Sequence, residues 1–259
     1  MKIVVLVKQV PDSGTERTLR ADDHTVDRAT ASNVINEMDE YAIEEALRIK
    51  EAQGGEVVVL TMGPERATDS IRKALSMGPD AAVHVLDDAL RGSCAVATSR
   101  VLAAAVAAQQ PDLVLCGAES TDGRVQVMPH MIAERLGYAA LTGARKLTVD
   151  GTNLTIERQT DDGYEIITAP TPAVVSVWDT INEPRYPSFK GIMAAKKKSV
   201  QTLSLADLGV PATDVGLAGA TSRVLEAAKR PVRHGGSKVP DSGDGGARLV
   251  EFLVTEKFV

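Results

Sequence analysis

Four short apolar runs in the first half of the chain limit the folds that this sequence can adopt. The runs are continuous rather than alternating, and they lie at residues 2–7, 56–63, 81–87 and 111–117. A strand with apolar side chains on both faces is buried on both faces, which is typical of a parallel sheet. A helix-like segment follows each run, so the sequence predicts an α/β fold with helices covering a parallel sheet.

The segments between the runs carry the usual signals of helix starts and ends. In the first of them Ile43, Ala46 and Leu47 follow helical spacing, and a glycine pair comes after them. The second begins with Pro64, has acidic residues early and ends at Gly78, which is the expected order for a helix. We predict helices at residues 39–55, 64–78, 93–110 and 126–137.

The pattern changes after about residue 140. Residues 146–169 alternate apolar and polar side chains across the turn sequences DG and DDG, which predicts an antiparallel hairpin or meander. Residues 172–178 predict a return to a buried strand. We therefore expect an α/β domain over residues 1–200, with this antiparallel extension, followed by a C-terminal arm at 201–259.

The arm begins with a short capped piece at 201–210. Residues 211–247 are rich in Gly, Pro, Ser and Ala and have little periodicity, which predicts an extended segment that packs only locally. The apolar end, 247–259, is expected to dock on another surface, because exposed leucines and phenylalanines favour aggregation.

Composition excludes several classes of protein. The net charge of −6 argues against general nucleic-acid binding, which needs a basic surface. No apolar stretch approaches the roughly 18 residues of a membrane span, and the N-terminus is typical of a strand rather than a signal peptide, so we expect a cytoplasmic protein that is not membrane-embedded. Cys94 and Cys116 form no CxxC motif, and we expect both to be small buried residues. The four histidines show no metal-ligand spacing; they are His24, His84, His130 and His234.

A ligand site is expected beyond the carboxyl ends of the strands. Four segments fall there: 7–9, 36–39, 61–65 and 116–123. Backbone N–H groups at helix starts favour phosphate, so together these segments can hold a nucleotide. None of them matches the GxGxxG or P-loop pattern, and ordinary strand–helix turns are the alternative. We expect Asp122 and Glu119 to form a solvated loop rather than an acid–base pair, and we find no nucleophile–base arrangement.

One short segment, 182–200, is basic and aromatic in a chain that is acidic and only 3% aromatic. It gathers a cluster of cations with several large apolar side chains. Its cations are Arg185, Lys190, Lys196, Lys197 and Lys198, and its apolar side chains are Tyr186, Phe189, Ile192 and Met193. An anionic partner responds to such a local patch and not to the net charge.

Five segments resemble the beta-subunit family of bacterial electron transfer flavoproteins. They are MKIVVLVKQVPD, EYAIEEALRIKE, IRKALSMGPD, PDLVLCGAESTDG and NEPRYPSFKGIMAAKKK. The resemblance runs almost continuously from residue 1 to about residue 210, and its last segment is the most specific. It implies a nucleotide-binding-like domain with an adenine nucleotide alpha hydrolase-type fold.

The resemblance also implies a function. The beta subunit forms a heterodimer with an alpha subunit that holds most of the FAD, and its C-terminal arm packs on that partner. Acyl-CoA dehydrogenases reduce the FAD, in fatty acid beta-oxidation among other routes, and a membrane quinone oxidoreductase takes the electrons. The subunit is then an electron carrier and not an enzyme.

The family's AMP positions are carried over residue by residue. They are Leu6, Asn36, Glu37, Met38, Asp39, Met62, Gly117, Ala118, Glu119, Ser120, Thr121, Asp122, Gly123, Arg124, Val125, Gln126, Val127 and Met128. Residues 126–128 read QVM where respiratory members often have Asn-Gln-Thr, and the Asp-Thr pair of members with a second FAD is missing. We therefore expect a structural AMP rather than a second FAD; an empty site is the alternative.

The basic segment matches the family's recognition loop, in which an apolar anchor, usually Leu, enters a pocket on the dehydrogenase. The matching residue here is Phe189. The residues assigned to docking are Arg185, Phe189, Lys190, Ile192, Met193, Lys196, Lys197 and Lys198, with the cations steering the encounter. The alternatives are a solvated helix end for the three consecutive lysines and a buried aromatic for Phe189. We expect Ile192 and Met193 to pack beneath the loop.

Two other functions are compatible with an α/β fold. One is a stand-alone regulatory module that binds an adenine nucleotide, which has no need of a basic loop and an arm. The other is a self-sufficient α/β enzyme, which the missing nucleophile, base pair and metal cluster disfavour.

Overall fold

The computed structural model describes residues 1–232, 235–236 and 238–259. Three residues of the predicted arm, Arg233, His234 and Ser237, lie outside the described residues. The chain divides into two units, Met1–Leu225 and Glu226–Val259.

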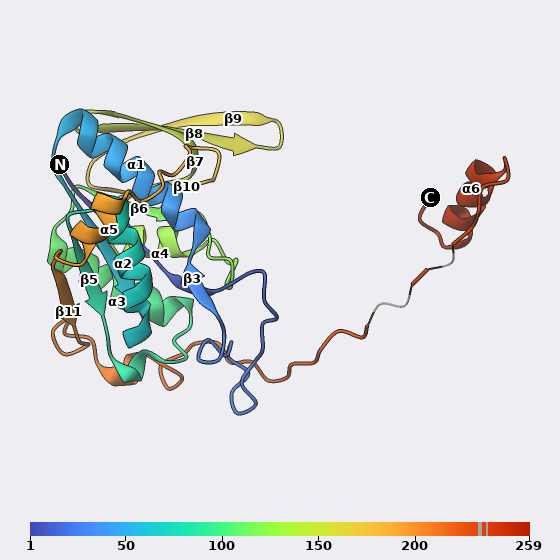
Figure 1. Cartoon of the computed structure of the whole chain (residues 1–259), viewed down its shortest axis with the longest axis horizontal. Coiled ribbons are helices and arrows are strands. Elements are labelled where there is room, and N and C mark those ends of the chain that lie inside the picture. The colour runs from blue at the N-terminus through green and yellow to red at the C-terminus, as the bar shows by residue number, and fades with distance from the viewer. Residues whose placement is uncertain (233–234, 237) are drawn as a thin grey trace. The chain divides into compact units, whose positions relative to one another are not determined.

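The first unit is built on a mostly parallel sheet, as predicted (Figure 1). Within the described residues the sheet has nine strands in the order β11-β5-β4-β1-β6-β10-β7-β8-β9. The strands are β1 (Lys2–Leu6), β4 (Glu56–Met62), β5 (Ala81–Val85), β6 (Leu113–Gly117), β7 (Ala139–Asp150), β8 (Asn153–Thr160), β9 (Gly163–Pro170), β10 (Ala173–Val177) and β11 (Val200–Leu203). The strands from β11 to β7 pair in parallel, and β8 and β9 extend the sheet as the predicted antiparallel meander.

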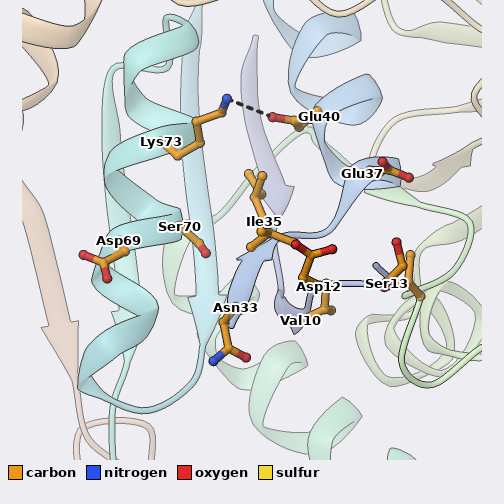
Figure 2. Close-up of a pocket in the computed structure, with 12 residues that line it drawn as sticks. Val10, Asp12, Ser13, Asn33, Ile35, Glu37, Glu40, Asp69, Ser70 and Lys73 are labelled. Carbon is orange, nitrogen blue, oxygen red and sulfur yellow. Dashed lines mark ion pairs between the residues drawn. The ribbon is translucent and has the colours of Figure 1, made fainter. Parts of the chain in front are cut away.

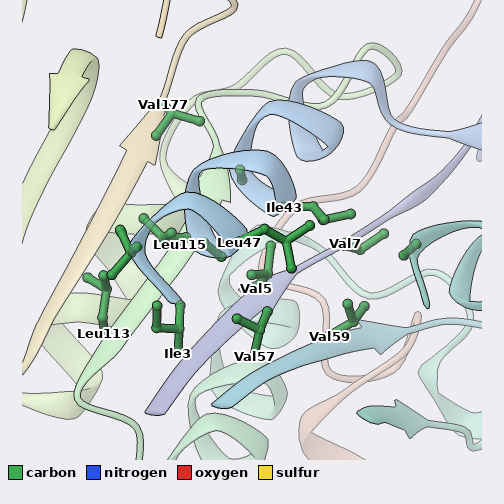
Figure 3. Packing of buried hydrophobic residues seen from close by; sticks show 14 of the residues in the cluster. Ile3, Val5, Val7, Ile43, Leu47, Val57, Val59, Leu113, Leu115 and Val177 are labelled. Carbon is green, nitrogen blue, oxygen red and sulfur yellow. The ribbon is translucent and has the colours of Figure 1, made fainter. Parts of the chain in front are cut away.

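Helices cover both faces of the sheet. The long helices are α1 (Glu37–Gln53), α2 (Thr68–Met77), α3 (Ala95–Gln109) and α4 (Met128–Leu136), within a few residues of their predicted positions. On one face Ile43 and Leu47 of α1 pack against Val5 and Val57 of the strands (Figure 3). The helices α3 and α4 cover the other face and bury Val101 and a second apolar cluster. The strands formed by the continuous apolar runs are thus buried on both faces, because helices cover both faces of the parallel sheet.

Two pieces of regular structure differ from the sequence-based expectation. The strands β2 (Gln9–Pro11) and β3 (Asn33–Ile35) form a small antiparallel pair that the sequence did not signal, because each has only three residues. The strand β11 pairs in parallel with β5. Residues 201–203 therefore belong to the sheet and not to an extended arm. Their mostly polar sequence, QTL, gave no signal of a strand.

Cys94 is a further correction. Cys116 is buried, as expected, but Cys94 is partly exposed at the start of α3, where its Sγ lies 3.4 Å from Thr221 Oγ1. Burial favours a high pKa for the Cys94 thiol, but hydrogen bonds from Thr221 and backbone N–H groups outweigh it and lower that pKa to about 7.

The second unit contains α6 (Gly245–Thr255), which lies mostly in the apolar end, 247–259, and begins two residues before it. No residue of α6 is buried, and Leu249, Val250, Phe252 and Val254 are all exposed. Docking of this apolar end on another surface stays a prediction. No helix in the described part of the chain is both long and apolar enough to cross a membrane.

Candidate nucleotide edge and docking segment

The predicted nucleotide residues gather at the carboxyl edge of the parallel sheet. Leu6 and Met62 end the strands β1 and β4, residues 36–39 begin α1, and residues 117–128 connect β6 to α4. Asn36 joins the last two segments. Its Nδ2 donates to the carbonyl oxygen of Glu119 at 3.0 Å, and its Oδ1 accepts from the backbone N–H of Thr121 at 3.1 Å.

Asp39 is the buried carboxylate of this edge. It accepts hydrogen bonds from the backbone N–H of Lys8 at 2.8 Å and from Asn36 Nδ2 at 3.0 Å. Burial raises the pKa of Asp39 to about 7, although these hydrogen bonds oppose the shift. Asp39 therefore sits in the fold close to the balance between its neutral and charged forms at neutral pH.

Gly117 allows β6 to approach the first turn of α1. A Cβ at this position would lie 2.5 Å from Met38 Cβ and 2.7 Å from Asp39 Oδ1, closer than real contacts permit. A glycine is thus required here for a close approach of two backbones.

Asp122 corrects a prediction. We expected a solvated residue, but its side chain is 0% exposed. Lys8 Nζ lies 2.7 Å from Asp122 Oδ1, and Arg28 Nε donates to Oδ2 at 3.1 Å. Burial alone would raise the pKa of Asp122, but Lys8 and Arg28 outweigh it and hold that pKa at about 2. The carboxylate is buried because two cations compensate its charge.

The loop between β2 and β3 supplies contacts that sequence reasoning missed. Arg28 comes from this loop, and Arg17 Nη1 donates to the carbonyl oxygen of Thr121 at 2.8 Å. Arg66 in turn donates to the carbonyl oxygen of Ala29 at 2.9 Å. None of these three arginines has a periodic or motif signal in the sequence, so only the fold reveals their contacts.

The rest of the 117–128 loop is more open. Gly123, Arg124, Val125 and Gln126 are exposed, and Gln126 Nε2 donates to Glu119 Oε2 at 2.9 Å. The side chains of this stretch are therefore accessible to a ligand or a partner chain, whereas the backbone N–H groups of Gly123 and Arg124 donate to the carbonyl oxygen of Ser120.

The charge balance at this edge fits the phosphate of an adenylate. A phosphate needs cations or N–H donors, and Lys8 and Arg28 bring two positive charges to the one carboxylate of Asp122. Their side chains are 42% and 38% exposed, so both have donors that can still reach a ligand. Lys8 and Arg28, which contact the 117–123 loop at Asp122, thus suit an anion.

A cavity of about 460 Å³ lies beside this edge and shares only Glu37 and Thr121 with the predicted set (Figure 2). It is an open cavity lined by residues of β2, β3 and the adjoining parts of α1 and α2. Acidic side chains dominate its polar lining: Asp12, Glu37, Glu40 and Asp69. Its lysine, Lys73, lies 3.6 Å from Glu40. Because the lining repels anions, a phosphate fits the 117–123 loop better than this cavity.

The docking segment lies elsewhere on the same unit and contains a short helix, α5 (Phe189–Ala195), beside α2 (Figure 1). Ser188 caps it, since its Oγ accepts from the backbone N–H of Gly191 at 3.0 Å. Phe189 is 81% exposed, which excludes the alternative of a locally buried aromatic. Tyr186 is 91% exposed and belongs to the same surface, although it was not among the predicted docking residues.

Ile192 and Met193 do not pack beneath the loop as expected. They are 45% and 47% exposed, and Ala195 is the buried residue of α5. The helix is short, and its buried side is narrow. Both side chains thus enlarge the apolar surface around Phe189.

Two of the predicted steering cations have internal partners instead. Arg185 forms ion pairs with Glu44 and Glu51 of α1. Lys198 Nζ donates to the carbonyl oxygens of Leu75 and Gly78, both at 3.1 Å, and so caps the C-terminal end of α2. The side chains of Lys190, Lys196 and Lys197 are exposed and form no ion pair within the described residues.

Comparisons with known proteins bear on both regions. The model of the electron transfer flavoprotein domain matches residues 23–208. The electron transfer flavoprotein subunit beta of Mycobacterium leprae is 51% identical over 263 aligned positions, covering 99% of both chains. The subunit beta of Thermoanaerobacterium thermosaccharolyticum is 40% identical over 87% of this chain, and that of Megasphaera elsdenii is 34% identical over all of it.

This chain belongs to the electron transfer flavoprotein family. The residues that match the family model include Asn36–Asp39, the 117–128 loop and the whole docking segment, while Leu6 lies before them. Proteins of this family carry electrons, and the resemblance seen in the sequence is confirmed. Within the described residues, no group of three or more His, Cys, Asp and Glu side chains is placed to hold a metal ion.

Proposed function

We propose that this chain is the beta subunit of a heterodimeric electron carrier, in which an alpha subunit holds most of the FAD. The observation that carries this proposal is the similarity to proteins named electron transfer flavoprotein subunit beta along nearly the full length of the chain. FAD supplies the redox chemistry when bound. The residues of this chain complete the carrier and present it to its partners.

The exposed apolar face of α6 supports the association with an alpha subunit. Leu249, Phe252 and Phe258 are exposed in the second unit, and such a surface is typical of one that a partner covers. Co-expression with the alpha subunit tests this directly. We expect a yellow complex at one flavin per heterodimer, and a chain that purifies colourless and alone would instead indicate a stand-alone nucleotide-binding module.

The nucleotide edge would hold a structural AMP. The cations Lys8 and Arg28 suit its phosphate, and Asn36 and Gly117 hold the two segments that flank the site together. The predicted set from Leu6 to Met128 would line this nucleotide. Acid extraction of the purified heterodimer should release one AMP. Two flavins per heterodimer, or no adenylate at all, would reject AMP at this site.

The docking segment would receive the electron donor. An exposed aromatic side chain that enters a pocket is a frequent hot spot of binding. Phe189 is such a side chain, and Ile192 and Met193 extend its surface. We infer that acyl-CoA dehydrogenases bind here and reduce the FAD, and that a membrane quinone oxidoreductase receives the electrons afterwards.

Phe189→Ala tests the docking role. We expect unchanged flavin content and a loss of at least about 2 kcal/mol of docking free energy, or roughly 30-fold in kcat/KM with a medium-chain acyl-CoA dehydrogenase. Stopped-flow absorbance of the FAD measures the rate. A matched control is Ile166→Ala, which removes another exposed apolar side chain, on β9 and outside the docking segment. An unaffected rate in Phe189→Ala, or loss of flavin, would contradict the docking role.

A further inference from the structure

The contacts of Arg185 differ from those of the other cations in the docking segment. Its Nε and Nη2 donate to the two carboxylate oxygens of Glu44, at 2.7 and 3.0 Å. Its Nη1 and Nη2 donate to the two oxygens of Glu51, at 2.5 and 3.1 Å. One guanidinium thus holds two carboxylates in a bidentate manner, which fixes its orientation as a single ion pair does not.

The carboxylate partners of Arg185 lie on one face of α1. Glu44 and Glu51 are seven residues apart, or about two helical turns, so their side chains point in the same direction. Glu44 is buried, and burial would raise the pKa of its carboxyl; hydrogen bonds from Arg185 and Arg48 outweigh that effect and lower it. The hydrogen bonds to Glu44 and Glu51 raise the pKa of Arg185 further above its already high value. The pair stays charged over the whole physiological range.

A second contact holds the start of the segment to the same helix. Asn182 Nδ2 donates to the carbonyl oxygen of Tyr41 and to Glu45 Oε2, both at 3.0 Å. The backbone N–H of Arg185 also donates to Glu44 Oε2, at 3.1 Å. Both the backbone and the side chain at position 185 are therefore fixed directly before the exposed ring of Tyr186.

The other end of the segment is fixed to α2. Arg72 Nη1 donates to the carbonyl oxygens of Ala195 and Lys198, at 2.7 and 3.1 Å. A Cβ at Gly191 would lie 2.5 Å from the carbonyl oxygen of Ser76, so α5 contacts the end of α2 closely. Between these two attachments the segment presents Tyr186 and Phe189 to solvent.

We propose that Arg185 is a positioning residue for docking: it fixes the start of the segment on α1 so that Tyr186 and Phe189 are preorganised for the dehydrogenase. This inference rests on the proposed function of the segment. A segment that is already ordered loses less conformational freedom on binding than a mobile one, so preorganisation strengthens docking without any contact of its own. Arg185 then contributes through geometry, whereas Lys190 contributes through charge.

The two roles predict opposite effects when Glu51 is neutralised. Glu51→Gln adds net positive charge near the segment and removes one of the two carboxylates that hold Arg185. A steering role predicts faster association with an acidic partner. A positioning role predicts weaker docking. Glu51 is exposed, so this variant is expected to fold even where Arg185→Met does not.

The experiment uses the purified heterodimer with a medium-chain acyl-CoA dehydrogenase and its acyl-CoA substrate. The variants are Arg185→Met, Arg185→Lys and Glu51→Gln. Lys190→Met is the control, because it also removes one positive charge from the segment. We measure kcat, KM for the heterodimer and the dependence of kcat/KM on ionic strength. The thermal unfolding midpoint and flavin content confirm that each variant is folded and loaded.

For Arg185→Met and Glu51→Gln we expect KM to rise about five-fold, with kcat within two-fold, and the rise in KM to persist at high ionic strength, where charges are screened. Arg185→Lys keeps the charge but loses the bidentate geometry, so it should resemble Arg185→Met. Lys190→Met should instead lower kcat/KM mainly at low salt and flatten the slope.

Two results would overturn the inference. One is an effect of Arg185→Met that disappears at high ionic strength, with normal activity in Arg185→Lys, which indicates a steering charge. The other is unchanged or improved docking in Glu51→Gln. Failure of the proposed function is recognised separately, because then Phe189→Ala also leaves the reaction with the dehydrogenase unaffected.

Discussion

The nucleotide edge and the docking segment use charged side chains in opposite ways. At the nucleotide edge a buried carboxylate, Asp122, draws Lys8 and Arg28 inward and holds two loops together. In the docking segment the internal ion pairs of Arg185 leave the large side chains of Tyr186 and Phe189 facing solvent. The first arrangement buries charge inside the subunit, and the second leaves an exposed surface that we propose receives a partner. Ion pairs of similar length therefore serve different purposes, and their surroundings distinguish them.

The largest expected effect on stability is at Gly117, where any side chain would clash with the first turn of α1. Gly117→Ala would place a methyl group 2.5 Å from Met38 Cβ and 2.8 Å from Met38 C, and the first turn of α1 would have to move. We expect a loss of about 3 kcal/mol in the free energy of unfolding, since the clash involves the backbone. Urea unfolding measures the loss, and the AMP content of the heterodimer should fall with it.

Gly246→Ala is the matched control for that change. Nothing lies within 4 Å of a Cβ at Gly246, which belongs to the second unit. The control should therefore be as stable as the unchanged chain. If Gly117→Ala unfolds at the same urea concentration as Gly246→Ala, the close approach of β6 to α1 has no energetic importance.

The next effect concerns the buried carboxylate of the nucleotide edge. Asp122→Asn removes the negative charge that compensates Lys8 and Arg28, and a hydrogen bond between charged groups is worth about 2 kcal/mol. We expect a loss of that order in the free energy of unfolding, measured in urea at pH 7. Asp22→Asn breaks a pair with Arg20 on the surface and should change stability much less. Equal losses in the two variants would remove the distinction between buried and exposed pairs.

The pH dependence of stability provides a third, smaller test, because the two carboxylates of the edge have opposite shifts. Asp39 has its pKa raised to about 7 by burial, so the folded chain binds a proton that the unfolded chain releases above about pH 4. Its contribution to stability is thus present at low pH and is lost as the pH rises from about 4 to 7. The slope from one such proton is at most about 1.4 kcal/mol per pH unit.

Asp122 has the opposite sign. Its pKa is lowered to about 2, so its contribution is present above the ordinary pKa near 4 and is lost as the pH falls towards 2. Denaturant unfolding from pH 3 to 8 separates the two. Asp39→Asn should flatten the decline between pH 4 and 7, and Asp122→Asn should flatten the fall below pH 4. If either variant leaves the pH dependence of stability unchanged in its own pH range, the pKa shift described for that residue is contradicted.

The sequence predicts the parallel sheet well because continuous apolar runs such as residues 2–7 leave few other structures open. It also predicts which segments lie at the nucleotide edge, because residues that follow neighbouring parallel strands meet at one edge of the sheet. It fails for Asp122, because the burial of a loop carboxylate depends on Arg28, which lies 94 positions earlier. Only the folded chain brings the two together.

The docking segment shows a similar division. Its aromatic and basic composition indicates a binding surface, and Phe189 is indeed exposed. The sequence treats Arg185 and Lys190 alike, as basic residues of one patch. The fold separates them, because two acidic residues of α1 face the first and no acidic partner within the described residues faces the second. The sequence did not predict β11, because its residues are mostly polar. The strand forms by pairing with β5 in the folded chain.

The smallest expected effect concerns the free lysines of the docking segment. Lys196 and Lys197 are exposed, so neutralising both to Gln should slow association with the dehydrogenase by about three-fold at low salt. The difference should disappear as added salt shortens the screening length to about 8 Å or less. Phe189→Ala should instead weaken docking equally at every salt concentration, because an apolar contact is not screened. Stopped-flow rates across ionic strength distinguish the two contributions, and a salt-independent effect of the lysine variant would assign these side chains to direct contact with the partner rather than to steering.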